Sequence, residues 1–291
     1  MSTTVLDPST PGTPGAPGTP GTPSTPDARE ATTHPGRGHT AYRRIPLGRI
    51  VGVELRKMFD TRSGFWLMAS IVITSVLATA ALIVFAPDDA LTFENFAAAI
   101  GAPMTVILPM IGILAVTSEW SQRSGLTTFT LVPHRGRVLG AKLIGAVGVG
   151  VAAMFVALVV GTLGTLVGSL VTGRDPVWDA TVAQFALIVL GSVLGMLFGF
   201  TLGVVLRNSA GAIVAYFVYT LVLPPLLGLL AANQQWFADL QPWVDYNLAQ
   251  TPLFLGEVSG EQWQQLAVAG TLWLLLPLAV GLGMVRRAEV K

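Results

Sequence analysis

Long apolar runs alternate with short charged segments along most of the chain. Six of the runs reach the roughly 20 residues that a helix needs to cross the hydrocarbon core of a bilayer. None of the six contains Asp, Glu, Lys, Arg or His. The predicted spans are residues 64–86, 97–116, 143–171, 180–206, 211–230 and 266–285. The pattern therefore predicts an all-α membrane protein with six transmembrane helices.

Composition narrows the functional classes. Hydrophobic residues make up 52% of the chain and charged residues only 11%, whereas soluble domains carry about 25% charged residues. A net charge of +1 gives no footprint for nucleic acid. The chain has no cysteine, and its three histidines lie outside the apolar runs. We therefore expect no metal site and no cofactor.

The distribution of basic residues predicts the orientation. Lys and Arg gather on the cytoplasmic side of membrane proteins. With both termini in the cytoplasm, the inner segments hold Arg43, Arg44, Arg49, Arg56, Lys57, Arg62, Arg123, Arg135, Arg137, Lys142, Arg207, Arg286, Arg287 and Lys291. The outer segments hold only Arg174. We therefore expect a multi-pass protein of the plasma membrane with both ends inside.

Two segments precede the spans. Residues 1–42 are rich in Thr, Pro and Gly, a composition typical of a disordered tail, here cytoplasmic, that cannot bury a core. Residues 43–63 predict an amphipathic elbow helix that lies among the lipid headgroups, and residues 64–291 form the six-span domain. The apolar face of the elbow holds Leu47, Ile50, Val51, Leu55, Met58 and Phe59, and its polar face Arg49, Arg56, Lys57 and Asp60.

Glu54 is the exception on the elbow, because helical spacing places it within the apolar face. Two interpretations remain open. Glu54 pairs with Lys57 on the next turn, or it bonds to a neighbouring helix and fixes the elbow in place.

Small residues and prolines predict the packing inside the membrane. Gly191, Gly195, Gly199 and Gly203 are spaced by four along the fourth span, which lets two helix backbones approach closely, either within one chain or between two copies. We expect kinks where prolines interrupt the spans: at Pro103, Pro109, Pro224, Pro225 and Pro277. The aromatic outer segment 231–265 predicts short helices at the membrane interface, acting as a lid or as an exit gate.

The inner segment between the second and third spans is unusually polar. We expect a short helix over residues 119–131, ended by Pro133, and a second helix from about Arg135 into the third span. In the simplest interpretation, Arg135, Arg137 and Lys142 meet lipid headgroups. That interpretation does not explain the short polar helix before them.

The same segment carries a resemblance. The pattern Glu-Trp-x-x-Arg-x-Gly-Leu-x-x-x-x-Leu-x-Pro-x-Arg-x-Arg over residues 119–137 resembles the first cytoplasmic loop of ABC-type exporter permeases of the type-two membrane family. The elbow sequence VELRKMFDTRSGFWL, residues 53–67, is similar to that family's approach to its first span. The resemblance covers residues 47–291 and includes the count of six spans. The Thr/Pro/Gly tail matches no part of it.

The resemblance implies a permease half that pairs with a second half, as a homodimer or heterodimer, and sits on two cytoplasmic ABC ATPase subunits. A loop helix over residues 123–130 would insert into a groove of the ATPase. The implied coupling residues are Glu119, Arg123, Gly125, Leu126, Thr128, Phe129, Pro133, Arg135 and Arg137, and the implied elbow residues are Glu54, Arg56 and Lys57.

Other functional classes fit less well. No G-x-x-x-x-G-K-[ST] loop is present, so the chain is not itself the ATP-hydrolysing enzyme. A secondary transporter or channel is the alternative, although proton-driven transporters place ionisable residues in the membrane. An intramembrane enzyme would need a nucleophile with a base there. The polar groups of the spans are hydroxyls and amides such as Thr74, Ser75, Thr105, Gln184, Tyr216 and Tyr219, which favours a hydrophobic or amphipathic export substrate.

Overall fold

A computed structural model describes residues 46–121 and 135–287 of the chain, and the described residues are largely helical. The N-terminal half holds α1 (Leu47–Asp60), α2 (Arg62–Phe85), the short helix η1 (Asp88–Ala90), α3 (Phe93–Ser121), α5 (Arg135–Thr172) and α6 (Val182–Leu206). The C-terminal part holds α7 (Ser209–Phe217), η2 (Val218–Val222), α8 (Leu223–Asn233), α9 (Gln235–Val244), α10 (Tyr246–Leu255), α11 (Gly260–Gly270), η3 (Thr271–Leu275) and α12 (Leu276–Arg287).

Six helical segments are long and apolar enough to cross a membrane, which confirms the predicted fold class. They are Gly64–Phe85, Phe93–Ser118, Gly136–Thr172, Val182–Leu206, Ser209–Asn233 and Gly260–Met284. The last span begins earlier than the sequence predicted, because Ser259 starts α11 with a capping box in which Ser259 and Gln262 satisfy each other's backbone N–H groups. The predicted elbow is α1, which ends at Asp60 and is followed at once by α2.

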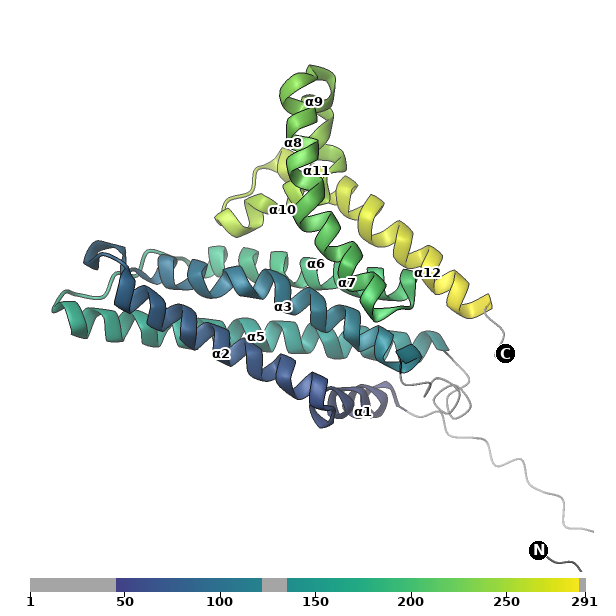
Figure 1. The fold of residues 1–291 in the computed structure, drawn as a ribbon, viewed down its shortest axis with the longest axis horizontal. Helices are drawn as coiled ribbons and strands as arrows, with labels where there is room; N and C mark the ends of the chain where they lie inside the picture. Colours follow the sequence, from purple (N-terminus) through teal and green to yellow (C-terminus); the bar gives the residue numbers. More distant parts are fainter. Residues whose placement is uncertain (1–45, 122–134, 288–291) are drawn as a thin grey trace, which may run out of the picture. The chain divides into compact units, whose positions relative to one another are not determined.

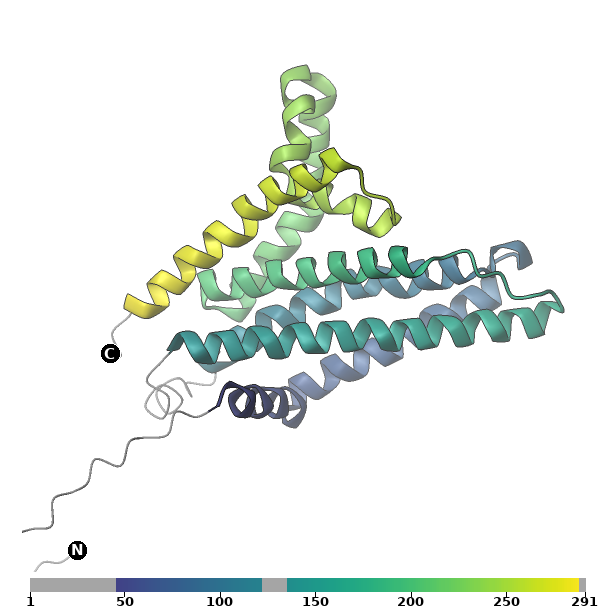
Figure 2. The same cartoon turned by 180° about the vertical axis from the view of Figure 1, so that it is seen from behind.

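Helix α3 lies at the centre of the bundle. Half of the residues in its span are buried, compared with 11% in the first and fifth spans. It packs along α6, α5 and α2, and these four helices run side by side in both views (Figure 1, Figure 2). The first and fifth spans therefore leave most of their apolar side chains at the surface, as lipid-facing helices do.

The contact between α3 and α6 depends on the regularly spaced glycines. A Cβ atom on Gly199 would lie 2.3 Å from the Pro109 carbonyl oxygen, and one on Gly203 would lie 3.1 Å from the Ile113 carbonyl oxygen. The α6 backbone therefore rests directly on the α3 backbone. Gly191 faces α10 instead, with Phe254 and Leu253 beside it.

Prolines shape the fifth and sixth spans. A π-helical turn, η2, precedes Pro224 and Pro225, and a second, η3, precedes Pro277. A proline has no N–H for the carbonyl four residues earlier and its ring crowds that turn, so the backbone widens locally into the rarer π form. By contrast, Pro103 and Pro109 lie within α3, which continues as one α-helix.

The aromatic segment between the last two spans folds into α9 and α10, as predicted for short helices there. Helix α10 packs along α6, and Leu253 and Phe254 lie against Gly191. Gly191 is nine residues beyond the start of α6 at Val182, so α10 reaches about 13 Å along α6 at 1.5 Å per residue. Helix α10 is therefore part of the helical core, whereas α9 packs against α8, α10 and α11 and lies farther from α3 and α6 (Figure 1).

The close α3–α6 contact makes a direct prediction. Replacing Gly199 with Ala places a methyl group on the Pro109 carbonyl, and overpacking of this kind costs about 1–3 kcal/mol. Thermal unfolding of the purified protein measures the loss. Gly195→Ala is the matched control, since its new Cβ atom would have no neighbour closer than 3.9 Å. Equal melting temperatures for the two variants would contradict the packing described.

Candidate functional site

A buried charge cluster joins the elbow helix to the bundle. Glu54 of α1 and Lys142 of α5 are both buried, and the Lys142 Nζ atom donates to Glu54 Oε2 at 2.6 Å. Lys57 donates to the other oxygen, Oε1, at 2.8 Å. One carboxylate therefore receives charged hydrogen bonds from a lysine on its own helix and from Lys142 on α5, which is 88 residues away in the sequence.

The two lysines set the charge state of Glu54. Burial acts to raise the pKa of this carboxyl, but the charges and hydrogen bonds of Lys142 and Lys57 outweigh that effect and hold the pKa below its usual value. Glu54 is therefore ionised at neutral pH. A buried carboxylate is tolerated here because both oxygens are bonded to ammonium groups.

Both interpretations of Glu54 from the sequence are present together, since it contacts Lys57 and a neighbouring helix. The expectation for Lys142 was wrong: its side chain lies in the interior with Glu54 and not among lipid headgroups. Apolar contacts accompany the ion pair, because Leu55 of α1 lies 3.6 Å from the position of a Cβ on Gly145 of α5. The remaining elbow residue, Arg56, lies on the exposed face and pairs with Asp60 at 3.7 Å.

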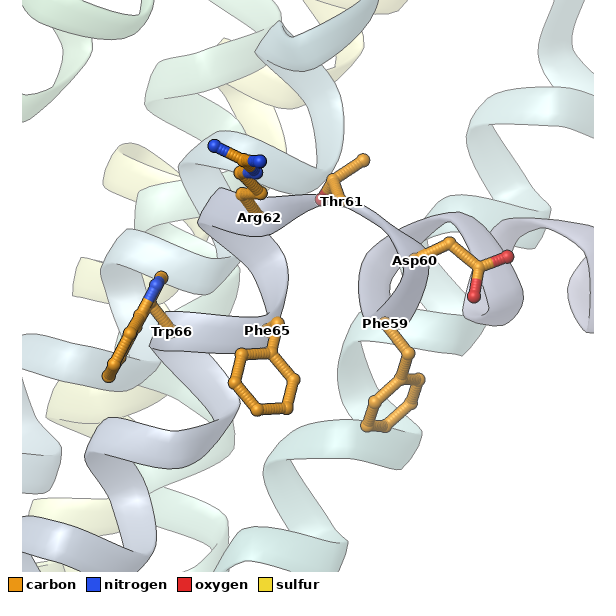
Figure 3. Close-up of a pocket in the computed structure, with 6 residues that line it drawn as sticks. All are labelled: Phe59, Asp60, Thr61, Arg62, Phe65 and Trp66. Carbon is orange, nitrogen blue, oxygen red and sulfur yellow. The ribbon is translucent and has the colours of Figure 1, made fainter.

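A one-residue turn at Thr61 connects α1 to α2. The Thr61 hydroxyl oxygen accepts from the Gly64 N–H at 3.1 Å and caps α2. A side chain on Gly64 would collide with the Met58 carbonyl, so the turn requires glycine. Figure 3 shows Phe59 and Phe65 projecting from the two sides of this turn, with Trp66 beside Phe65. All three aromatic residues are at least half exposed, as expected at a membrane interface.

The predicted coupling segment falls mostly outside the described residues. Arg123, Gly125, Leu126, Thr128, Phe129 and Pro133 all lie there, as does the expected short helix over 123–130. Glu119 belongs to the last turn of α3, and Arg135 and Arg137 belong to the first turn of α5. The described helices therefore fix the two ends of the segment, and Lys142 follows its second end by about one and a half helical turns.

A second tight connection, between α6 and α7, lies beside the end of α3. Arg207 closes α6 with a left-handed backbone, φ 51°, a conformation that costs a non-glycine residue about 1–3 kcal/mol. Asn208 caps α7 by accepting from the Gly211 N–H at 2.9 Å. The Ser209 hydroxyl donates to the Thr117 hydroxyl of α3 at 2.8 Å. Sequence reasoning assigned no role to this turn, although its single basic residue between two spans was a signal.

We call the end of the bundle that carries α1, the start of α5 and the α6–α7 turn the basic end. Among the described residues it holds Arg49, Arg56, Lys57, Arg62, Arg135, Arg137, Lys142 and Arg207. At the opposite end, Arg174 lies 3.8 Å from Asp88, and Asp179 accepts from the Glu94 N–H at 2.8 Å. The basic residues thus meet at one end of the helices, as the charge pattern predicted.

A cavity of about 90 Å³ opens between α3, α6, the η2 turn and α10. Of the polar residues that the sequence singled out in the spans, Thr105, Tyr216 and Tyr219 line it. Ser192 and Asn247 also line it. The sequence offered Ser192 only as a hydroxyl with no base nearby, and it gave no sign of Asn247. The others are occupied elsewhere: Thr74 and Ser75 bond to carbonyls of their own helix, and Gln184 caps α6 with Thr181.

An aromatic cluster forms one wall of the cavity and holds the two π turns together. The Phe198 ring lies 4.5 Å from that of Tyr219 in η2, and the Tyr219 ring lies 4.8 Å from that of Trp273 in η3. Trp273 donates to the Val244 carbonyl at 2.7 Å, and Tyr246 donates to the Leu194 carbonyl at 3.2 Å. The hydrogen bonds anchor the aromatic side chains of this cluster to α9 and α6.

Within the described ranges, no group of three or more His, Asp or Glu side chains could hold a metal ion. A scan against protein-family models and a search of curated proteins found no match to the chain.

The Glu54 cluster predicts how the elbow responds to mutation. Glu54→Gln removes the carboxylate charge that Lys142 and Lys57 contact, and breaking one partner of a buried pair costs about 3–5 kcal/mol. The free energy of unfolding of the detergent-solubilised protein should fall accordingly. The double variant Glu54→Leu with Lys142→Met removes both charges and should recover most of that loss. Arg56→Gln, which affects only the exposed pair with Asp60, should change little.

Acid provides an independent check on the same pair. Because the pKa of Glu54 is lowered by folding, its contribution is fully present above the ordinary value of 4.5 and disappears as the pH falls through the lowered value. Wild type should therefore lose this part of its stability in acid, whereas Glu54→Gln has none of it to lose. Parallel pH profiles for the two proteins would exclude a stabilising ion pair.

Proposed function

We propose that the chain is the membrane-spanning permease subunit of an ATP-driven ABC exporter, with ATP hydrolysis supplied by separate cytoplasmic subunits. It pairs with a second permease half, the same chain or a related one, within the lipid of the plasma membrane. The basic end faces the cytoplasm, and residues 119–137 receive the ATPase.

The observation that carries this proposal is the buried Glu54–Lys142 pair. It ties the elbow to α5 at Lys142, about one and a half turns after Arg137, the last residue of the segment to which the resemblance assigns the ATPase contact. A force on that segment would act on the elbow and on α5 together. An ion pair that a membrane helix must bury is costly, so its place at this junction is better explained by positioning than by stability alone.

The helices on both sides of the segment are suited to carry motion. α3 has 29 residues and α5 has 38, and each continues without a break across the bundle. α3 rests on α6 through backbone contact at Gly199, so a displacement at its basic end is transmitted to α6. Close packing of this kind moves as discrete rigid elements.

The proposed substrate class rests on the lack of charged side chains around the cavity between α3, α6 and α10. No cavity-lining residue between α3, α6 and α10 is ionisable at neutral pH, so a small ion would lose its hydration without compensation. A hydrophobic or amphipathic compound suits the surface better. The same feature weighs against the alternative of a proton-driven secondary transporter, which needs ionisable groups at membrane depth.

The proposal predicts a specific loss of coupling. Arg123→Glu and Arg135→Glu should uncouple ATP hydrolysis from transport, because each reverses a charge at the proposed ATPase contact, while the bundle stays folded. The assay is transport by proteoliposomes containing both subunits, with ATPase activity measured in parallel. Arg174→Glu, at the opposite end of the bundle, is the control and should leave coupling intact. Full transport without any ATPase would exclude the proposal.

The orientation can be tested separately by labelling. Because the chain has no cysteine, Thr128→Cys and Asp175→Cys each introduce one unique thiol. In intact cells, a membrane-impermeant maleimide should modify Cys at position 175 and not at position 128, since the two positions lie on opposite sides of the membrane. Modification at position 128 from outside would reverse the proposed topology.

A further inference from the structure

The cavity between α3, α6, η2 and α10 contains polar groups that nothing in the described chain satisfies. Tyr219 is only 7% exposed, and its hydroxyl makes no hydrogen bond of normal geometry, although the backbone N–H groups of Tyr246 and Asn247 lie near it. The Ser192 hydroxyl and the Asn247 side-chain amide line the same cavity, and neither makes a hydrogen bond within the described residues. Ser192 and Asn247 are partly exposed, but the Tyr219 hydroxyl is buried. Buried polar groups are nearly always bonded, so this unpaired hydroxyl beside a cavity indicates a missing occupant.

The neighbouring polar groups are already engaged, which makes these three distinctive. Tyr216 donates to the Thr105 carbonyl, and Gln250 donates to the Tyr246 carbonyl at 3.3 Å. Thr220 donates to the Tyr216 carbonyl at 2.9 Å. The fold thus satisfies the polar atoms that it uses for packing and leaves Tyr219, Ser192 and Asn247 directed to the cavity.

The backbone around the cavity also departs from regular structure. Tyr219 lies in the π turn η2 and contacts Trp273 in the second π turn, η3. Single π turns inside α-helices are frequent at functional sites. Here the widened turn places Tyr219 beside Phe198 of α6 and beside α10.

The chemistry of the lining selects an uncharged ligand. The lining contains no Asp, Glu, Lys, Arg or His. The nearby carboxylate of Asp245 is already used, because it accepts from the N–H groups of Asn247 and Leu248 and from Gln241. The apolar part of the wall consists of Phe198, Phe254, Met104 and Pro109, together with two glycines. A cation or an anion would therefore meet no counter-charge, whereas a ring with a hydroxyl or amide group would meet both surfaces.

We propose that this cavity binds an uncharged molecule of about one ring, such as an aromatic alcohol or amide, with its polar group against Tyr219, Ser192 and Asn247. The cavity volume of about 90 Å³ is smaller than the engineered cavity of roughly 150 Å³ that holds benzene, so the ligand is no larger than one ring. Use of this site for cargo would rest on the proposed function. Binding itself requires no ATPase and is measured without nucleotide.

The experiment uses 4-fluorophenol as the probe. The full chain in lipid nanodiscs is titrated with it, and binding is followed by ¹⁹F NMR with displacement by unlabelled phenol to separate specific binding from partition into lipid. Saturable, displaceable binding is expected. 4-Fluorobenzoate, which is charged, should show none. A probe signal that unlabelled phenol does not displace would report partition into lipid alone, and the proposal would be wrong.

Three variants locate the site. Gly195→Leu fills the cavity, in which a Cβ at this position has no neighbour within 3.9 Å, and should abolish displaceable binding. Gly228→Leu, at a position with open space around it on α8, is the matched control and should bind as wild type does. Tyr219→Phe should weaken binding about tenfold, the effect of losing one hydrogen bond, without lowering the melting temperature, because the deleted hydroxyl has no partner. Unchanged binding in both Gly195→Leu and Tyr219→Phe would overturn the assignment.

Discussion

The structure depends on one constraint: hydrocarbon offers no hydrogen-bond partner to a polar group. Each span must satisfy its own backbone, which only a helix does within a single segment, and charged side chains must lie at the ends. The described chain follows this rule closely. Its buried carboxylate in the elbow, Glu54, is neutralised by Lys142 and Lys57. Glu54 and Lys142 are therefore buried as a pair, and the pair fixes the position of α1 against α5.

Apolar side chains alone cannot hold such helices together, since lipid tails are equally apolar. The bundle instead relies on shape. Gly199 lets α6 touch the Pro109 carbonyl of α3, and no larger residue would allow that approach. The prolines act in the opposite way, because they disturb the hydrogen-bond ladder and open π turns before Pro224 and Pro277. The cavity lies where α3, α6 and α10 meet the widened turn η2.

Much of this architecture is visible in the sequence, because span length, charge exclusion and proline position are local properties. Lys57 was identifiable as a partner of Glu54, being three residues away. Lys142 was not, because it lies 88 residues away and hydrophobic periodicity carries no information on such pairs. The predicted start of the sixth span lies too late in the sequence, because Glu261 lowers the local hydropathy. Ser259 and Gln262 nevertheless form a capping-box pattern that marks the true start of the helix. The three unpaired groups of the cavity come from three separate segments, η2, α6 and α10, so only the three-dimensional structure brings them together.

The two proposed sites share α3, and that sharing has a thermodynamic consequence. The end of α3 enters the segment assigned to the ATPase, while Thr105 and Pro109 in its middle line the cavity. A shift of α3 that alters the cavity changes its affinity for a ligand. By linkage, a ligand that prefers one position of α3 must then favour the matching state of the basic end by the same free energy. Occupancy of the cavity would thus be sensed at the ATPase without any contact between the two sites, and the rigid Gly199–Pro109 contact is the point through which α6 would follow.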